Sequence, residues 1–585
     1  MIKKFFISML GTIAGFWISL ILAVFVGLAI VGALISSGSG QKPAVAKNSI
    51  LYLDLSGSMP ERYQPADFWQ IVKDADSNSE SLVDILDALR AAKSDSKIKG
   101  VYINAAGAAA GFASREEIVE AIKEFKTSGK WVYAYADAYA QGDYMLASLA
   151  DSVFLNPIGA VDVHGVAAQT PFYKGLLDKL GVKMEVVRVG TFKSAVEPYM
   201  TNEMSPASRL QTQVMVDSLW NYYTSVVSEA RNVAVTAVDG WADSIMAVWG
   251  AGRTLDAGAV TALRYRHDVE SMLRAECGLD ENDELNLVSP STYMSSLDGP
   301  DAGRDHIAVL FACGDIVDSG EGGIVGATMV PEIYKLADNE NVKALVLRVN
   351  SGGGSAFASE QIWKALEYFK SKDKKFYVSM GDYAASGGYY ISCGADRIFA
   401  DHCTLTGSIG VFGLIPDFSG LVTDKLGVTF STVQSSANAT FPSVLTGLTP
   451  YQREALQKSV ERTYDVFTSR VAEGRHISQD SVKAIAEGRV WTGGAALQLG
   501  LVDELGSLNS AINAIADEIG IEADKVIYYP AVEDKFLTEL LAEMRGNVKA
   551  GGLDINESAM RVLRMLDRLQ TAAPVQTRMP QVYFE

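Results

Sequence analysis

The chain has 585 residues, too many for one ordinary hydrophobic core, and this length suggests about two to four domains. Its 51 basic and 70 acidic side chains give a net charge of −19, which argues against nucleic acid as a partner because phosphate binding needs a basic surface. The four cysteines are too few for a disulfide scaffold and lack the spacing of a structural zinc site. Cys393 and Cys403 could pair in an oxidising compartment, but buried free thiols fit this composition better.

The amino-terminal segment is strongly apolar. From Phe5 to Ile35 there are 31 mostly apolar residues without a charge, whereas about 20 suffice to cross a bilayer. A cleaved signal peptide would have a shorter apolar region, of about 7–15 residues, although Ala44-Val45-Ala46 resembles a cleavage site. We therefore expect an uncleaved transmembrane anchor over residues 1–35 and a linker over residues 36–48.

Short sequence segments recur in the same order in the two halves of the chain. Phe112-Ala113-Ser114 recurs as Phe357-Ala358-Ser359, Tyr223-Thr224-Ser225 as Phe467-Thr468-Ser469, and Val248-Trp249 as Val490-Trp491. Repeats in matching order indicate a tandem duplication. We expect one unit over residues 49–303, a second over 304–545, and a carboxy-terminal tail over 546–585 that contains an amphipathic helical pattern.

Within each unit, apolar runs rich in β-branched residues alternate with helical patterns. The expected strands are Ile50–Leu55, Gly100–Ile103 and Trp131–Ala136 in the first unit, and Ile307–Ala312, Ala344–Val349 and Phe376–Met380 in the second. Near-continuous apolar runs separated by helices are typical of strands that are buried on both faces of a parallel sheet. The predicted fold class is therefore α/β. Two long helical patterns, one per unit, are expected to cover the sheets.

Two features of the second unit are candidates for a catalytic site. Ser351-Gly352-Gly353-Gly354 follows an expected strand, and glycines there leave backbone N–H groups uncovered, as an oxyanion cradle requires. Ser386 follows the next strand and is flanked by small residues at the start of an expected helix. An N-cap serine is the simpler interpretation. However, Gln141 occupies the equivalent position in the first unit, which suggests one catalytic and one degenerate copy.

A nucleophilic serine needs a base, and the residues alone leave its identity open. His164 and His402 lie at spacings that do not exclude them, although each is more often structural. A lysine would serve only if burial lowered its pKa towards the working pH. Lys193 is one such candidate, and taken alone it is more typical of a solvated surface residue.

Several motifs together resemble the signal peptide peptidase A family in its long, duplicated form, of the protease IV type. They are Gly190-Thr-Phe-Lys-Ser-Ala-Val-Glu-Pro198, Ala385-Ser-Gly-Gly-Tyr389, Thr406-Gly-Ser-Ile-Gly410, and Arg489-Val-Trp-Thr-Gly493 followed by Gly500-Leu-Val-Asp503. The resemblance covers essentially the whole chain, with the motifs in the family's order. It implies a fold related to Clp protease and crotonase, and a Ser/Lys dyad whose members come from different units.

By motif position, Ser386 is similar to the family's nucleophile, Lys193 to its general base, and Ser408 to the serine that orients this lysine. The N–H groups of Gly354 and Gly387 would form the oxyanion hole. The family usually has proline where this chain has Gly352, so the turn is less constrained here. Glu197 would oppose a lowered pKa of Lys193 if it faced the amine, and we expect it to pair elsewhere.

The resemblance also implies a protease that degrades cleaved signal peptides and other hydrophobic peptides without a metal or organic cofactor. It implies a homo-oligomer, a tetramer, held in the inner membrane by a single span with its body in the periplasm. Lys3 and Lys4 agree with a cytoplasmic amino terminus. The alternatives are a crotonase-like acyl-CoA enzyme, which would not need Ser386, and an inactive membrane-anchored scaffold.

Overall fold

The computed structural model describes residues 43–63, 80–297, 299, 303–320, 322–531, 575–579 and 583–584. No helix within these ranges is long and apolar enough to cross a membrane. The expected anchor, most of the linker and the amphipathic pattern of the tail lie outside the described residues. The boundaries proposed for the two units stay predictions.

The first unit contains a parallel six-stranded sheet in the order β7-β4-β3-β2-β1-β8. Its strands are β1 (Ser49–Leu55), β2 (Ile98–Ala105), β3 (Trp131–Tyr139), β4 (Ser152–Val161), β7 (Ala262–Leu263) and β8 (Leu287–Val288). The three strands expected here from the sequence are confirmed as β1, β2 and β3. Their mostly buried residues explain the continuous apolar runs.

The second unit contains a similar sheet in the order β18-β16-β14-β12-β9-β20, in which β15 pairs with β14, β19 pairs with β15, and β18 runs antiparallel to β16. Its strands are β9 (His306–Cys313), β12 (Val342–Ser351), β14 (Lys375–Ala385), β15 (Arg397–Ala400), β16 (Leu405–Gly407), β18 (Val490–Thr492), β19 (Glu504–Leu505) and β20 (Val526–Tyr529). The expected strands are confirmed as β9, β12 and β14. The α/β class and the duplication are thus both correct.

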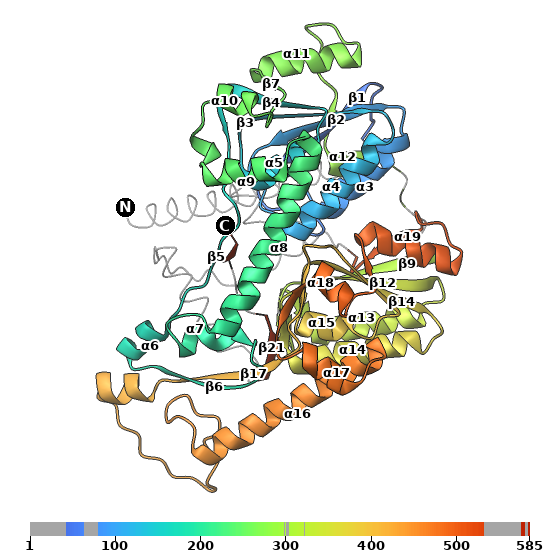
Figure 1. Ribbon diagram of the computed structural model, residues 1–585. Coiled ribbons are helices and arrows are strands. Elements are labelled where there is room, and N and C mark those ends of the chain that lie inside the picture. Colours follow the sequence, from blue (N-terminus) through green and yellow to red (C-terminus); the bar gives the residue numbers. More distant parts are fainter. Residues whose placement is uncertain are drawn as a thin grey trace, which may run out of the picture.

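Each unit contains several helices, some of which pack on its sheet (Figure 1). In the first unit they are α3 (Leu82–Ser94), α4 (Phe112–Lys126), α5 (Gln141–Ala147), α6 (Lys174–Leu180), η1 (Ser194–Val196), α7 (Glu197–Met200), α8 (Pro206–Arg231), α9 (Val235–Asp243), η2 (Met246–Val248), α10 (Ala251–Asp256), α11 (Arg266–Cys277) and α12 (Pro290–Ser296). In the second they are α13 (Gly326–Asp338), α14 (Ala356–Lys370), α15 (Gly387–Ser392), η3 (Leu421–Lys425), α16 (Pro450–Arg475), α17 (Gln479–Ile485), α18 (Gly493–Gln498) and α19 (Leu508–Ile519). The two expected long helices are α8 and α16, each with 26 residues.

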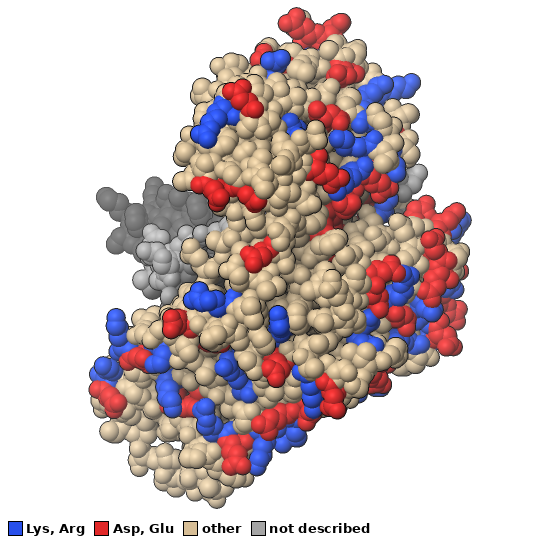
Figure 2. All heavy atoms as spheres, in the orientation of Figure 1, with Lys and Arg blue, Asp and Glu red and all other residues tan. Residues whose placement is uncertain are grey.

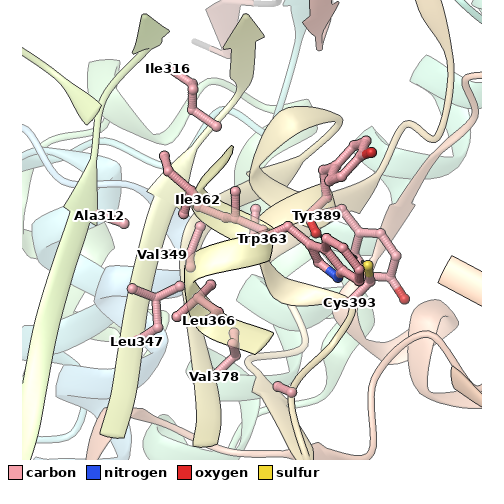
Figure 3. Packing of buried hydrophobic residues seen from close by; sticks show 14 of the residues in the cluster. Ala312, Ile316, Leu347, Val349, Ile362, Trp363, Leu366, Val378, Tyr389 and Cys393 are labelled. Atoms are coloured by element: carbon pink, nitrogen blue, oxygen red, sulfur yellow. Dashed lines mark hydrogen bonds between the residues drawn. The ribbon is translucent and has the colours of Figure 1, made fainter. Parts of the chain in front are cut away.

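Each sheet has its own hydrophobic core. In the second unit, Leu347 and Val349 of β12 pack with Ile362 and Leu366 of α14 (Figure 3). These side chains are essentially inaccessible to solvent. Burying one such side chain contributes about 1.5–3 kcal/mol to stability. The strand that ends at the glycine-rich turn is therefore firmly held.

A third sheet joins the two units, in the order β11-β10-β13-β21-β17-β6. Its strands are β6 (Lys183–Val189), β10 (Ile316–Val317), β11 (Ile324–Val325), β13 (Gly353–Ser355), β17 (Val411–Asp417) and β21 (Val575–Arg578), and a separate pair joins β5 (Ala168–Gln169) to β22 (Tyr583–Phe584). Strand β6 of the first unit pairs antiparallel with β17 of the second over seven residues. The segment after β6 is thereby carried into the second unit.

Helix α8 also connects the two units (Figure 1). Tyr223 and Val226, towards its end, belong to the first core. Met215, nearer its start, packs with Leu405 and Val490 of the second unit. The helix begins at an N-cap, Ser205, whose side chain accepts a hydrogen bond from a backbone N–H of the first turn. Far from covering only its own sheet, α8 reaches the edge of the site described below.

Candidate active site

Ser386 lies at the tight turn between β14 and α15. Its backbone has φ +57° and ψ −113°, a conformation that costs a non-glycine residue about 1–3 kcal/mol. The Ser386 N–H donates to Gly407 O at 2.8 Å, and Ser386 O accepts from Tyr390 N at 2.8 Å. A strained turn from strand to helix is the geometry that presents a nucleophilic serine in other hydrolases.

The amine of Lys193 faces this serine. Lys193 Nζ lies 2.7 Å from Ser386 Oγ, 3.0 Å from Ser408 O and 3.1 Å from Ser408 Oγ. All three side chains are completely buried. The residues that the sequence motifs single out as catalytic are therefore brought together, although 193 positions separate Lys193 from Ser386.

Burial lowers the pKa of Lys193 well below its usual range, because the charged ammonium loses its hydration. A nearby carboxylate would oppose this shift. Glu197 does not, because its Oε1 accepts from Ser205 Oγ at 2.7 Å and its Oε2 from Ser205 N at 3.2 Å. The expectation that Glu197 pairs elsewhere is confirmed. The surroundings of Lys193 therefore favour the neutral amine.

Ser408 is itself held in place. Its N–H donates to Arg489 O at 2.7 Å, and its hydroxyl lies 3.3 Å from Gly488 O, to which it can donate. Gly488 is required here, because a Cβ at this position would lie 2.6 Å from Cβ of Lys193. Its φ of +77° also favours glycine. The loop around residue 488 thus forms a close wall around the lysine.

Gln211 of α8 holds the segment that carries Lys193. Its Nε2 donates to Phe192 O at 3.1 Å and to Ser194 Oγ at 2.8 Å, and its Oε1 accepts from Val490 N at 3.2 Å. It therefore fixes the residues on either side of Lys193 to the second unit. Sequence reasoning missed this residue, because a single glutamine on a long helix carries no motif.

The two histidines that the sequence left open lie elsewhere. His402 Nδ1 is 2.8 Å from Glu116 Oε1, and His164 Nδ1 is 2.9 Å from Asp162 Oδ1. Both side chains are about half exposed to solvent. Neither is bonded to Ser386, whose hydroxyl has Lys193 as its partner in the part of the chain that the structure describes.

The glycines expected to form the oxyanion hole lie in β13 and at the start of α15. Gly354, in β13, must be glycine, because a Cβ there would lie 2.1 Å from Ile316 O. Gly387 is the first residue of α15, so its N–H is one of the donors that a helix leaves without an internal partner. Their role as oxyanion donors stays a prediction.

Strand β21, from the carboxy-terminal tail, lies between β13 and β17. Its backbone pairs antiparallel with both, Thr577 opposite Gly354 and Gln576 opposite Phe412. Met579 N donates to Gly352 O at 2.6 Å, and Arg578 forms an ion pair with Asp315. The place beside the expected oxyanion donors therefore accepts an extended chain.

Residues 124–280 and 368–522 match Peptidase family S49, one matched range in each unit. The chain belongs to Peptidase family S49. It is 37% identical to Protease 4 of Haemophilus influenzae over 523 residues, which cover 86% of this chain and 84% of that protein. It is also 37% identical to Protease 4 of Salmonella typhi, over 90% of this chain and 87% of the relative.

A more distant relative is the chloroplastic serine protease SPPA of Arabidopsis thaliana, 27% identical over 92% of this chain and 79% of its own. Among solved structures, ClpP1 from Listeria monocytogenes aligns with 34% of this chain and 91% of its own, at 15% identity and a TM-score of 0.23. The Clp-protease-like fold implied by the motifs stays a prediction. Membership of family S49 makes the chain a serine peptidase.

The first S49 unit has no serine at the equivalent turn. Gln141 begins α5 there, and its Oε1 accepts from His164 N at 2.8 Å and Gly165 N at 2.9 Å. Asp143 Oδ2 accepts from Gly107 N at 2.7 Å, in the loop equivalent to the glycine-rich turn. In the first unit, the side chains of Gln141 and Asp143 therefore occupy the turn that carries Ser386 in the second unit.

All four cysteines of this S49 peptidase are free thiols. Cys393 and Cys403 are buried and unpaired, as the composition suggested. Burial raises the pKa of the Cys393 thiol to about 12, so it stays protonated at neutral pH. Within the described ranges, no group of His, Cys, Asp and Glu side chains is arranged to hold a metal ion.

Proposed function

We propose that this chain is a membrane-anchored endopeptidase in which Ser386 attacks the peptide bond and Lys193 is the general base. The observation that carries the proposal is the 2.7 Å separation of Lys193 Nζ and Ser386 Oγ in a completely buried pair. A lysine has an ordinary pKa near 10.4 and is protonated at neutral pH. Its lowered pKa supports a neutral amine that can accept a proton.

The hydrogen bonds around the amine support this assignment. A neutral lysine amine has two N–H donors and one lone pair. Ser408 O and Ser408 Oγ are two acceptors for the donors, at 3.0 and 3.1 Å. The lone pair can then face the hydroxyl proton of Ser386. In this proposal Ser408 orients the base and does not itself react.

The reaction follows from these positions. Lys193 takes the hydroxyl proton as Ser386 Oγ bonds to the substrate carbonyl carbon, and the carbonyl oxygen becomes an oxyanion near the N–H groups of Gly354 and Gly387. The protonated lysine then gives its proton to the leaving amine as the C–N bond breaks. Water, deprotonated by Lys193, hydrolyses the acyl-enzyme and restores Ser386.

We propose that the substrates are extended hydrophobic peptides, including cleaved signal peptides. Strand β21 supports an extended binding mode, because its backbone pairs with β13 and β17 beside Ser386. The side chain of Met579 packs against Met215, Leu405 and Val490. An apolar side chain is therefore accommodated next to the strand position. Strand addition of this kind takes its affinity from backbone hydrogen bonds and its selectivity from such side-chain pockets.

The location and assembly are proposals of the same kind. The uncharged run from Phe5 to Ile35 supports a single span in the inner membrane with the body in the periplasm. Deleting residues 1–46 should release an active soluble body.

Exposed apolar side chains in the loop after η3, including Phe430 and Val433, support association with further copies as a tetramer. On the face shown in Figure 2, basic and acidic side chains are interspersed.

A serine-directed fluorophosphonate probe tests the central proposal. The wild-type protein should be labelled at Ser386, as located by peptide mass spectrometry, and should lose its hydrolysis of apolar peptides in proportion. Ser386→Ala should be neither labelled nor active, whereas His402→Ala, as the control, should be labelled like the wild type. Labelling that persists in Ser386→Ala, or activity that survives complete labelling, would exclude Ser386 as the nucleophile.

A further inference from the structure

The strand that presents Ser386 is irregular just before the serine. In the ladder between β12 and β14, Val349 pairs with Met380, but Ser351 pairs with Ala384. Three residues, 381–383, therefore stand opposite Asn350 alone. Such a bulge bends a strand and leaves backbone groups without ladder partners. Here the Tyr383 N–H donates to Asn350 Oδ1 at 3.1 Å, so a side chain replaces the missing backbone acceptor.

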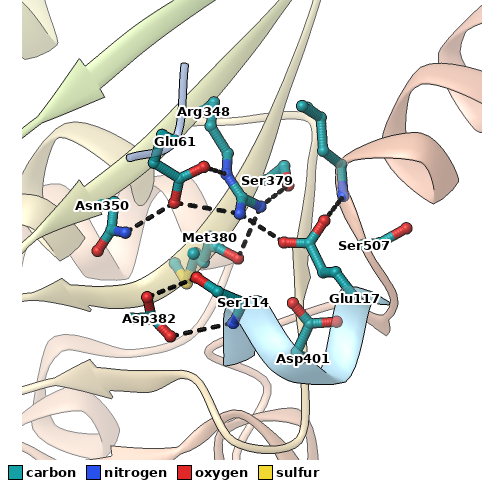
Figure 4. Close-up of polar contacts among 12 residues, drawn as sticks. Glu61, Ser114, Glu117, Arg348, Asn350, Ser379, Met380, Asp382, Asp401 and Ser507 are labelled. Carbon is teal, nitrogen blue, oxygen red and sulfur yellow. Dashed lines mark hydrogen bonds and ion pairs between the residues drawn. The ribbon is translucent and has the colours of Figure 1, made fainter. Parts of the chain in front are cut away.

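The amide of Asn350 is held by a residue of the other unit. Its Nδ2 donates to Glu61 Oε1 at 2.7 Å. The same carboxylate is bound by the guanidinium of Arg348, with Nε 2.9 Å from Oε2 and Nη2 3.2 Å from Oε1. Figure 4 shows Glu61 beside both Arg348 and Asn350. One first-unit carboxylate thus contacts two side chains of the strand that leads into the glycine-rich turn.

Arg348 uses all its donors in this cluster. Besides Glu61, it donates to Ser379 Oγ at 2.9 Å, to Met380 O at 3.3 Å and to Glu117 of α4. Burial alone would lower the pKa of Arg348, but Glu117 and Glu61 raise it well above its usual range, so the guanidinium stays charged. It joins β12 and β14 of the second unit to two carboxylates of the first.

The bulge is shaped around the Glu61 carboxylate. A Cβ at Gly381 would lie 2.5 Å from Glu61 Oε1 and 3.1 Å from Asn350 Nδ2. Glycine at the first bulge position therefore permits the close approach of Glu61. The bulge ends three residues before Ser386, whose backbone is in an unfavourable conformation. Such a conformation persists only when its surroundings hold it on several sides.

We propose that Glu61 is a positioning residue for Ser386. Through Asn350 and Arg348 it fixes the bulge in β14 and thereby the direction in which the serine hydroxyl points. The first unit then orients the nucleophile as well as supplying Lys193, and a loosely docked first unit would leave the serine misaligned. The inference rests on the proposed role of Ser386 as the nucleophile.

The test compares Glu61→Gln and Asn350→Ala with the wild type and with Glu80→Gln. Glu80 is the matched control, because it is also a largely buried glutamate of the first unit but bonds to the backbone and hydroxyl of Ser291. Loss of one member of a buried ion pair can unfold a protein. Asn350→Ala leaves the pair of Arg348 with Glu61 intact and is therefore the second, milder variant.

We expect kcat for an apolar peptide to fall about 10- to 100-fold in both variants, because a displacement of about 1 Å in a reacting group costs up to ~10²-fold. KM should stay within about twofold, and fluorophosphonate labelling of Ser386 should slow by the same factor as kcat. The pH at which kcat/KM rises should not move, because Lys193 is unchanged. The double variant should be no slower than the slower single variant, since both act through one chain of contacts.

A purely structural role would lower the melting temperature and leave kcat normal in the folded fraction. A wild-type kcat in folded Asn350→Ala and in folded Glu61→Gln would overturn the inference. It would also be overturned if the decreases in kcat of the two single variants added up in the double variant, or if Glu80→Gln showed an equal decrease in kcat. If Glu61→Gln does not fold, the kcat of Asn350→Ala alone tests the inference. An unlabelled Ser386 in the wild type would instead overturn the proposed function, and this inference with it.

Discussion

Lys193 combines features that a lysine seldom has together. It is completely buried, no carboxylate among the residues that the structure describes neutralises it, and three oxygen atoms surround its amine. An ammonium in such a place would lose its hydration without gaining an ion pair, which favours the neutral form. The residue is therefore suited to accept a proton.

The first prediction is that Lys193→Met abolishes peptide hydrolysis. Methionine keeps an unbranched apolar side chain and removes the base, so kcat/KM should fall by about 10²–10⁴-fold, as is usual when a general base is lost. In the wild type, kcat/KM should rise with pH through the lowered pKa of Lys193, because only the neutral amine accepts the proton. Steady-state kinetics at several pH values measure both effects. His164→Ala is the control, and inactivity of this control beside an active Lys193→Met would contradict the assignment.

The second prediction concerns stability. An unfolded chain binds a proton at Lys193 up to a pH of about 10.4, whereas the folded chain releases it at lower pH. Between these two pKa values the unfolded state binds more protons, so wild-type stability rises with pH by up to about 1.4 kcal/mol per pH unit from this residue. Lys193→Met lacks this contribution. Denaturant unfolding from pH 7 to pH 9.5 should show the variant's relative stability decreasing as pH rises, and a constant difference would mean that Lys193 is charged in the folded protein.

At the scale of elements, strands β6 and β21 bring the Lys193 segment and part of the carboxy-terminal tail to the site. Pairing of β6 with β17 carries the first-unit segment that ends in Lys193 across to the serine. Pairing of β21 with β13 and β17 places part of the tail beside Gly354. If peptides bind there as strands, β21 and the substrate compete for the same backbone groups.

The third prediction is that deleting residues 575–585 lowers KM for short apolar peptides. If β21 occupied this place about 90% of the time, its removal would lower KM about tenfold and leave kcat unchanged. A synthetic peptide with the sequence of residues 575–585 should inhibit the shortened enzyme competitively. Arg578→Ala should give a smaller effect in the same direction, because a partly exposed ion pair with Asp315 contributes about 0–1 kcal/mol. An unchanged KM together with no inhibition by the peptide would show that substrates bind elsewhere.

At the scale of the whole molecule, the site depends on both units. Lys193, Gln211 and Glu61 belong to the first, and Ser386, Ser408 and the glycine-rich turn to the second. The first unit has lost its own serine turn, where Gln141 and Asp143 bond to its backbone. In the proposed reaction, the first unit acts only through its contacts with the second unit.

The fourth prediction is that residues 304–585 without the first unit do not hydrolyse peptides. Co-expression of 43–303 with 304–585 should restore turnover to within about tenfold of the intact chain, because β6, α4 and α8 can dock on the second unit without a covalent link. Lys193→Met in the first piece should abolish the restored activity. Turnover by 304–585 alone would contradict a base supplied from the first unit.

The sequence by itself determined the α/β class, the duplication and the expected central strands. A strand that is buried on both faces of a sheet consists of nearly continuous apolar residues, and this pattern can be recognised in the sequence. Its motifs also pointed to Ser386, Lys193 and Ser408, since the resemblance to a family compares residue types and needs no distances. Short motifs of this kind say nothing about neighbours that lie far apart along the chain.

Only the tertiary structure decided how these residues meet. The 2.7 Å contact of Lys193 with Ser386 depends on the pairing of β6 with β17, and no local pattern records that pairing. The same holds for Gln211 and Glu61, which are ordinary polar residues in the sequence and become important through contacts across the two units. Even the lowered pKa of Lys193 is a tertiary property, because its cause is complete burial, which arises only when the two units pack together.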